Sequence, residues 1–191
     1  MTSPSELHNQ VRAAYSAIAV APAENTFFPC GRQLAENLGY PAEVLDRLPL
    51  AAVEAFCGVG DVSLWADIQA SDLVLDVGCG AGLDTILAAS RAAKVVGIDF
   101  SLEMLQRAQL CLEKAGLAGK VTLLKAEVQS LPLLDASMDV ALVNGLFNVN
   151  PFREEAFREL ARVLRPGGVL YASELVLREP AVLGAETNWF G

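Results

Sequence analysis

The sequence predicts an α/β fold, in which a helical N-terminal segment precedes a doubly wound and mostly parallel sheet. Between residues 73 and 173, short apolar runs alternate with helical patterns, as they do in sheets of this kind. Residues 73–93 read as strand, tight turn and helix, whereas residues 1–70 carry only helical patterns. We therefore expect a helical segment over residues 1–70, a ligand-binding core over 71–176 and a tail over 177–191.

The N-terminal segment begins with a predicted amphipathic helix over residues 5–20, where apolar side chains recur at helical spacing. His8 lies beside this apolar stripe, and we expect it on a solvated surface. A helical segment ahead of a nucleotide-binding core commonly packs over the carboxyl edge of the sheet, so we expect a lid, with a plain packing appendage as the alternative. Prolines and glycines divide the rest of the segment into short helices, expected at residues 31–38, after Pro41, after Pro49, at 51–56 and at 62–68.

The core is predicted to contain five strands, most of them joined by helices. Ser101 is a suitable N-cap for one of these helices, Gly116 follows its end, and Cys111 falls on its packed face. The strands are expected at residues 73–77, 94–98, 121–125, 138–143 and 169–173, and the helices at 83–93, 101–115 and 152–164, with a turn at 165–168.

The loop after the first strand carries glycine at alternate positions, Gly78, Gly80 and Gly82. Glycine allows positive φ and lets a ligand approach the main chain closely, and the free N–H groups of the following helix attract anions. Asp99 closes the second strand about 20 residues later, the spacing at which a carboxylate accepts hydrogen bonds from ribose hydroxyls. These features predict a nucleoside ligand. The dinucleotide fingerprint requires glycine where this chain has Leu83, so the pattern is G-x-G-x-G.

Composition limits the classes of function. A net charge of −9 without a cluster of basic residues argues against a nucleic-acid substrate and for a small molecule. No apolar run is long enough to cross a bilayer, and the N-terminus has neither the basic start nor the apolar stretch of a secretion signal. We therefore expect a cytoplasmic protein with no membrane partner. The four cysteines lack close pairing and are expected to be free thiols.

Four segments resemble the motifs of class I S-adenosylmethionine-dependent methyltransferases. They are residues 74–84, 97–105, 125–132 and 162–168, in the order in which that family carries them. The resemblance implies a Rossmann-like fold and S-adenosyl-L-methionine as the cofactor. The residues it implies for cofactor binding are Gly78, Gly80 and Gly82 at the methionine part, Asp99 at the ribose, Glu127 at the adenine amino group, Asp76 orienting the loop, and Cys79, Phe100, Met104, Val128 and Asn144.

Within that superfamily the sequence is most similar to arsenite methyltransferases. Cys30-Gly31, Cys57-Gly58 and the run from Asn144 to Pro151 carry this resemblance. It implies a metalloid substrate, trivalent arsenic, with Cys30 and Cys57 as thiolate ligands, because arsenic in this state is soft and binds sulfur. The substrate would then present its lone pair to the sulfonium methyl group.

The sequence also departs from the arsenite methyltransferase pattern. Where the family has a pair of cysteines near its first thiolate position, this chain has Phe28-Pro29-Cys30, with one cysteine. Gly145 stands where the family has a cysteine after the fourth strand. The sequence ends at Gly191, where the family continues with further strands, another cysteine and a further domain. We therefore expect a fragment or a shortened protein, with its C-terminal strands shortened or missing and with one thiolate fewer than the family uses.

Two other functions fit the same residues. The first is methylation of a quinone or another carbon, oxygen or nitrogen acceptor, in which the cysteines only pack. Methyl transfer needs an aligned nucleophile more than a strong acid or base, although an oxygen or nitrogen acceptor could use Glu174 as the base. The second is a protein that binds the cofactor or a metalloid without turnover.

Overall fold

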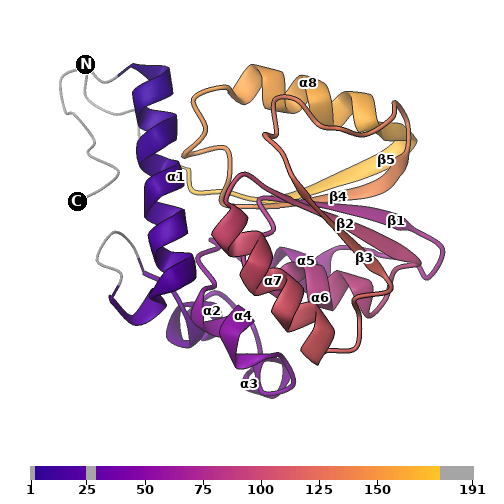
Figure 1. Cartoon of the computed structure of the whole chain (residues 1–191). Helices are drawn as coiled ribbons and strands as arrows, with labels where there is room; N and C mark the ends of the chain where they lie inside the picture. The colour runs from indigo at the N-terminus through magenta and orange to yellow at the C-terminus, as the bar shows by residue number, and fades with distance from the viewer. Residues whose placement is uncertain (1–2, 25–28, 177–191) are drawn as a thin grey trace.

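A computed structural model of the chain describes residues 3–24 and 29–176, and five strands in these residues form one parallel sheet (Figure 1). The strand order is β3-β2-β1-β4-β5, and every neighbouring pair is parallel. Phe28 and the tail predicted at residues 177–191 lie outside the described residues. The strands are β1 (Leu73–Val77), β2 (Lys94–Asp99), β3 (Val121–Lys125), β4 (Met138–Asn144) and β5 (Leu164–Ser173).

Helices cover both faces of the sheet, which confirms the doubly wound α/β prediction. Helices α5 (Val62–Trp65), α6 (Leu83–Ala89) and α7 (Leu102–Lys114) lie on one face, and α8 (Arg153–Val163) lies on the other (Figure 1). Ser101 caps α7 as predicted, because its side chain accepts a hydrogen bond from the Met104 amide.

The central strands are apolar on both sides because both faces are covered. Leu75 and Val77 point into a core beneath α8, and Val74 points into a second core against α5 and α6. This alternation places Asp76, the next residue on the Val74 side, over the first turn of α6. Its carboxyl group lies 2.5 Å from the Thr85 hydroxyl, inside the protein.

The N-terminal residues form α1 (Pro4–Val20), η1 (Pro22–Glu24), α2 (Arg32–Asn37), α3 (Ala42–Leu45) and α4 (Leu50–Glu54). Figure 1 shows α1 standing beside the sheet, next to the start of α7. Side chains of α1 contact Phe100, Ser101 and Glu127, which follow β2 and β3, so this helix lies across the carboxyl ends of both strands. Helices α2 and α4 share a hydrophobic core with α6 and α7 and are thereby joined to the sheet domain.

Three predicted elements differ from the observed ones by three or more residues. Helix α5 ends at Trp65 instead of residue 68, because the backbone of Ala66 is extended. Helix α6 ends at Ala89 instead of residue 93, because the Ala93 amide donates to the Asp72 carbonyl and turns the chain into β2. Strand β5 begins at Leu164 instead of residue 169, so the predicted turn at 165–168 is a bulge within the strand. Across residues 3–24 and 29–176, no helix combines the length and apolar character needed to span a bilayer.

Candidate cofactor and acceptor site

The loop after β1 is held against the end of β2 by its own backbone. The Gly78 and Cys79 amides both donate to the Ile98 carbonyl, at 2.8 and 3.0 Å. Gly78, Gly80 and Gly82 have φ of +74°, +51° and +89°, which confirms that the alternate glycines adopt left-handed conformations. The main chain of this loop is thereby brought to the carboxyl edge of the sheet.

Asp99 points toward this loop. One carboxylate oxygen accepts from the Gly80 amide at 2.9 Å and the other from the Ser101 amide at 2.8 Å. The side chain is buried, and desolvation raises the pKa of Asp99 to about 6, although the two amide donors oppose this shift. A carboxylate that the fold has already fixed in direction and desolvated suits recognition of ligand hydroxyl groups.

Two spaces open beside Asp99, with volumes, open solvent included, of about 660 Å³ and about 390 Å³. Both spaces border Gly78, Asp99 and Phe100. A Cβ atom added at Gly80 would meet only the Met104 sulfur, at 4.0 Å, so a side chain here would project into the larger space. The pair of spaces fits a bent ligand that consists of a nucleoside and an amino-acid part.

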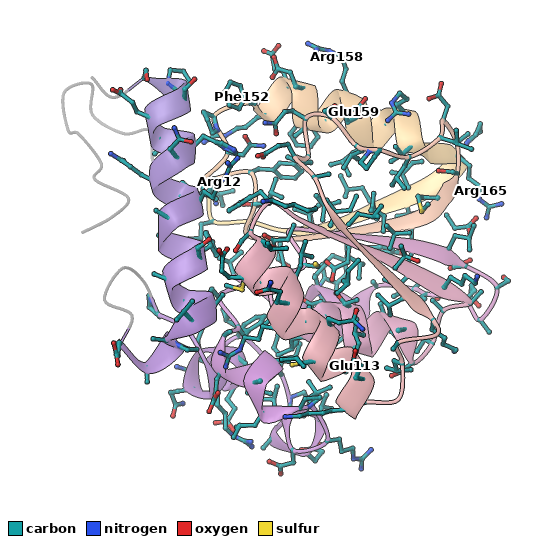
Figure 2. All side chains as sticks on the ribbon, viewed as in Figure 1. Arg12, Glu113, Phe152, Arg158, Glu159 and Arg165 are labelled. Carbon is teal, nitrogen blue, oxygen red and sulfur yellow. The ribbon has the colours of Figure 1, made fainter. Side chains whose placement is uncertain are left out.

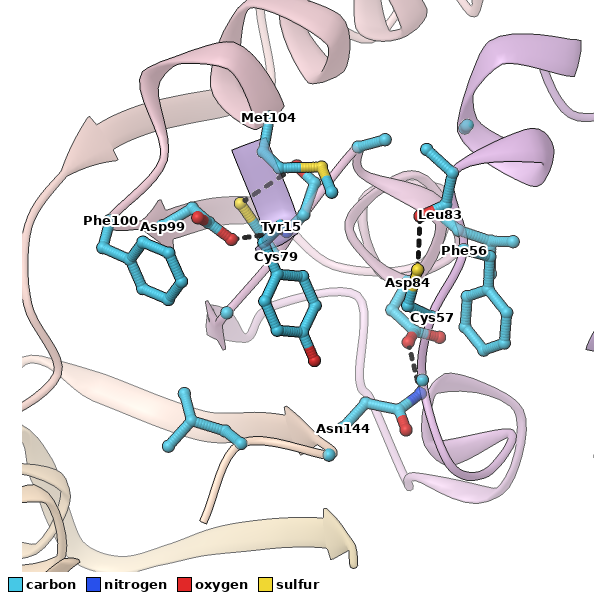
Figure 3. A pocket seen from close by; sticks show the side chains of 18 of the residues that line it. Tyr15, Phe56, Cys57, Cys79, Leu83, Asp84, Asp99, Phe100, Met104 and Asn144 are labelled. Atoms are coloured by element: carbon cyan, nitrogen blue, oxygen red, sulfur yellow. Dashed lines mark hydrogen bonds between the residues drawn. The ribbon is translucent and has the colours of Figure 1, made fainter. Parts of the chain in front are cut away.

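Most of the residues predicted for cofactor binding border one of these spaces, which together we call the cofactor cleft. Figure 3 shows the larger space. The larger space is lined by Gly78, Cys79, Gly80, Asp99, Phe100, Met104 and Asn144, and the smaller by Gly78, Asp99, Phe100, Glu127 and Val128.

Asp76 and Gly82 border neither space and support the loop from behind. Asp76 is buried beneath the loop, where burial and the nearby Asp84 raise its pKa to about 8. Gly82 is the N-cap of α6, and a Cβ atom there would lie 3.3 Å from the Ala108 side chain. Its lack of a side chain allows α6 and α7 to pack closely.

Helix α1 supplies one wall of the smaller space, through side chains that the sequence analysis did not assign to the site. Arg12 forms an ion pair with Glu127, and His8 Nε2 lies 3.0 Å from the other Glu127 oxygen. Figure 2 shows Arg12 on the side of α1 that faces the sheet. The prediction that His8 is solvated was wrong: its side chain is only 14% exposed and packs edge-on against Phe100.

The spacing of residues 8, 11 and 15 was the signal for this wall, because three- and four-residue steps place side chains on one helix face. Val11 lines the smaller space, and Tyr15 lines the larger one. In Figure 3 the Tyr15 ring is seen between Asp99 and Asp84. Helix α1 therefore contributes to both halves of the cleft.

Asp84, which the sequence analysis did not single out, lies at the edge of the cleft and joins three segments. It accepts hydrogen bonds from the Tyr40 hydroxyl at 2.5 Å, from the Ser63 hydroxyl and from the Asn144 amide at 2.9 Å. The Asn144 carbonyl oxygen accepts from the Val59 and Gly60 amides. This network holds the loop that follows Cys57 against the end of β4.

Cys30 and Cys57 come together, although 27 residues separate them in the sequence. The two thiols lie close enough for Cys30 to affect the pKa of Cys57, and the Gly31 amide donates to the Phe56 carbonyl at 2.7 Å. The Cys30 and Cys57 thiols themselves donate to the Pro22 and Ala55 carbonyls, at 3.5 and 3.4 Å. Burial and the neighbouring Cys30 raise the pKa of Cys57, so the Cys57 thiol stays protonated at neutral pH. Cys57 borders the larger space of the cleft. Cys79 and Cys111 are buried, and all four cysteines are free thiols.

Glu174 does not border the cofactor cleft, so its predicted use as a base is not supported by its position. Its carboxylate accepts from the backbone amides of Leu146, Phe147 and Asn148, at 2.7, 2.8 and 3.3 Å. A carboxylate bound to three amides serves to fix the loop after β4.

Comparison with known proteins agrees with this geometry. Residues 75–172 match the family model described as "Methyltransferase domain". The arsenite methyltransferase of Halobacterium salinarum is 33% identical over 76% of this chain and 37% of its own length. A ubiquinone/menaquinone biosynthesis C-methyltransferase of Syntrophotalea carbinolica is 41% identical over 53% of this chain and 43% of its own length.

A solved structure shares the same fold. The phosphoethanolamine N-methyltransferase 1 of Haemonchus contortus, in complex with phosphoethanolamine and S-adenosylhomocysteine, superposes with a TM-score of 0.65 and 21% identity. The superposition covers 90% of this chain and 33% of that one. The chain thus spans less than half the length of these three proteins. By its sequence and its sheet, it belongs to the methyltransferase domain family and has the cofactor-binding core of an S-adenosylmethionine-dependent methyltransferase.

Proposed function

We propose that the chain binds S-adenosylmethionine in the cofactor cleft and transfers its methyl group to a small molecule. The observation that carries this proposal is the position of Asp99, which contacts the Gly80 amide and borders both spaces of the cleft. A carboxylate in this position can accept hydrogen bonds from ribose hydroxyls while the two parts of the ligand lie on either side.

Each wall of the cleft has a distinct role in this proposal. The glycine loop contacts the methionine part, Asp99 the ribose, and Glu127 the adenine amino group. The cofactor supplies an electrophilic methyl group when it is bound. Helix α1 acts as a lid that keeps water from the cleft and aligns the acceptor, and this positioning accounts for much of the rate in a displacement at carbon.

Titration calorimetry tests this proposal. We expect saturable, one-to-one binding of S-adenosylhomocysteine, the demethylated product. Absence of saturable binding by both S-adenosylhomocysteine and S-adenosylmethionine would contradict the proposal. Incubation with cofactor labelled in its methyl group then tests transfer itself.

The first acceptor that we propose is trivalent arsenic, bound by Cys30 and Cys57. The proximity of these two thiols and the place of Cys57 at the cleft support it. Arsenic in this state forms strong bonds to sulfur, so a pair of adjacent thiols can hold it near the methyl group. Trivalent arsenic forms three bonds, and the two cysteines supply sulfur for two of them. Gly145, at the position where arsenite methyltransferases have a cysteine, supplies no third thiol.

Substitution of Cys57 tests the arsenic hypothesis. We expect Cys57→Ser to abolish release of methylated arsenic, because the hydroxyl does not replace the thiolate as a ligand for a soft metalloid. Cys111→Ser, at a thiol buried elsewhere, is the matched control and should leave methylation in place. Equal arsenic methylation by both variants would exclude the thiol pair as the acceptor site.

A second candidate acceptor is a carbon, oxygen or nitrogen centre of an organic molecule. A large apolar space beside Cys57 favours it. In this case Cys57 only lines the apolar space and binds no arsenic. We then expect Cys57→Ser to leave methyl transfer to the organic acceptor intact.

A further inference from the structure

A third space, with a volume of about 840 Å³ that includes open solvent, lies beside the cofactor cleft, and we call it the side chamber. It shares five lining residues with the larger space of the cleft: Tyr15, Cys57, Gly58, Gly145 and Val149. Of the residues that line the smaller space around Glu127, only Val149 also lines the side chamber. The side chamber therefore adjoins the half of the cleft in which we place the methionine part of the cofactor.

The remaining walls of the side chamber are mostly apolar. Leu34 and Leu38 come from α2 and its C-terminal end, Val59 from the loop held by Asn144, and Leu175 from the end of β5. None of the described residues that line the chamber carries a charge. A concave wall of this composition is typical of a pocket for an organic ligand.

The few polar groups on these walls are neutral and partly used by the protein. The Asn148 amide donates to the Leu175 carbonyl at 2.8 Å, and the raised pKa of Cys57 keeps its thiol protonated at neutral pH. Glu174, which precedes the lining residue Leu175, is bound by three backbone amides. A charged ligand group would therefore lose its hydration without gaining an ion pair in the chamber.

We propose that the side chamber binds the acceptor and that this acceptor is an uncharged organic molecule with an apolar body. Its reacting atom would lie at the shared boundary beside Tyr15 and Cys57, and its body would fill the space between Leu34, Leu38 and Leu175. This proposal rests on methyl transfer as the proposed function, and it takes the second candidate acceptor, an organic molecule, in place of arsenic. Inorganic arsenite is small and polar, and it would leave most of the chamber unfilled.

Fluorescence of the uncharged probe N-phenyl-1-naphthylamine tests the proposal on the full chain. We expect saturable binding with a one-to-one stoichiometry. We also expect 2-naphthol to displace the probe at a concentration at least roughly tenfold lower than 2-naphthoate, which has the same ring system with a carboxylate. Equal displacement by both compounds would overturn the proposal, as would the absence of saturable probe binding.

Substitutions locate the probe. Leu175→Glu places a carboxylate on the chamber wall at a half-exposed position, and we expect it to weaken probe binding about tenfold. Leu38→Gln is a second, neutral variant with the same expected direction. Leu134→Glu, at a side chain that is 80% exposed outside the chamber, is the control and should bind the probe like the parent protein. If both wall variants bind the probe as tightly as the control, the chamber is not its site.

Titration with S-adenosylhomocysteine separates this proposal from the proposed function. All three variants should bind S-adenosylhomocysteine like the parent protein, which also shows that they are folded. Binding of S-adenosylhomocysteine without probe binding would contradict the proposed acceptor site in the side chamber but would support the cofactor site. Probe binding that the wall variants weaken, without any binding of S-adenosylhomocysteine, would support an apolar pocket and overturn the proposed function.

Discussion

Asp99 lies where three elements of the cofactor cleft meet. It closes β2, accepts from the Gly80 amide of the neighbouring loop, and accepts from the Ser101 amide at the start of α7. Three elements therefore fix its direction. Its burial among these elements raises the pKa of Asp99, because a carboxylate is less well solvated inside the protein than in water.

We expect Asp99→Asn to lower the affinity for S-adenosylhomocysteine by roughly 10- to 100-fold, the range for loss of hydrogen bonds to a charged group. In the parent protein, affinity should fall as the pH is lowered from 7 to 5, because the pKa of Asp99 is raised to about 6 and protonation removes an acceptor. Titration calorimetry over this range measures both effects.

Asp135→Asn is the control for this experiment, because the Asp135 side chain is 78% exposed and pairs with Arg162 away from the cleft. It should retain the affinity and the pH dependence of the parent protein. An Asp99→Asn variant with full affinity would show that Asp99 only orders the loop.

At the scale of elements, the end of β4 serves as a junction. Asn144 accepts from the Val59 and Gly60 amides, donates to the Gly60 carbonyl at 2.7 Å, and donates to Asp84. The loop that carries Cys57 is thereby tied both to the sheet and to α6. This loop forms the boundary between the cofactor cleft and the side chamber, so its position governs both spaces.

We expect Asn144→Ala to lower the free energy of unfolding by about 2–3 kcal/mol, because it leaves two partly buried amides and an oxygen of the buried Asp84 without their partner. Urea unfolding measures this change. Asn37→Ala removes one hydrogen bond between exposed side chains, with Gln33, and should change the free energy of unfolding by less than about 1 kcal/mol. Similar values for both variants would show that the junction is not important for stability.

Helix α1 is the second element on which the site depends. Val11 and Tyr15 line opposite halves of the cleft, and Arg12 binds Glu127. We expect S-adenosylhomocysteine to slow amide hydrogen exchange in α1, because a ligand between the helix and the sheet adds contacts to both. Mass spectrometry locates the protected peptides.

Helix α8 is the internal reference for this measurement, since it covers the opposite face of the sheet from α6 and α7 (Figure 1). Its exchange should change less than that of α1. Protection of the glycine loop with no protection of α1 would contradict the lid hypothesis and favour a plain packing appendage.

At the scale of the whole molecule, stability depends on acids buried beneath the cofactor loop. Asp76 is buried, with Asp84 and Asp99 as its acidic neighbours, and its pKa is raised to about 8. In the unfolded chain its pKa is near the usual value of about 4. Between these two values the folded state binds more protons than the unfolded state, so Asp76 contributes less stability as the pH rises from about 4 to about 8.

We expect Asp76→Asn to reduce this dependence, because the amide is neutral at every pH and can still accept from Thr85. The free energy of unfolding of the variant, relative to that of the parent protein, should increase as the pH rises from about 4 to about 8. Urea unfolding at several pH values measures the difference. A constant difference across this range would show that Asp76 has an ordinary pKa in the folded protein.

The sequence alone determined the sheet and the position of the cofactor cleft. Apolar runs fix the strands, helical spacing fixes most helices, and neighbouring parallel strands place their carboxyl ends at one edge. Asp99 and the glycine loop therefore meet wherever this topology forms. The bounds of α6 and β5 were less well predicted, because a long-range amide contact ends the first and a bulge extends the second.

Only the tertiary structure decided which distant side chains complete the site. Arg12 meets Glu127 across 115 residues, Tyr40 meets Asp84 across 44, and Cys30 meets Cys57. No local pattern encodes these contacts, because they depend on how α1 and the short helices pack against the sheet. The side chamber has the same origin: its walls come from segments that are far apart in the chain and become neighbours only on folding.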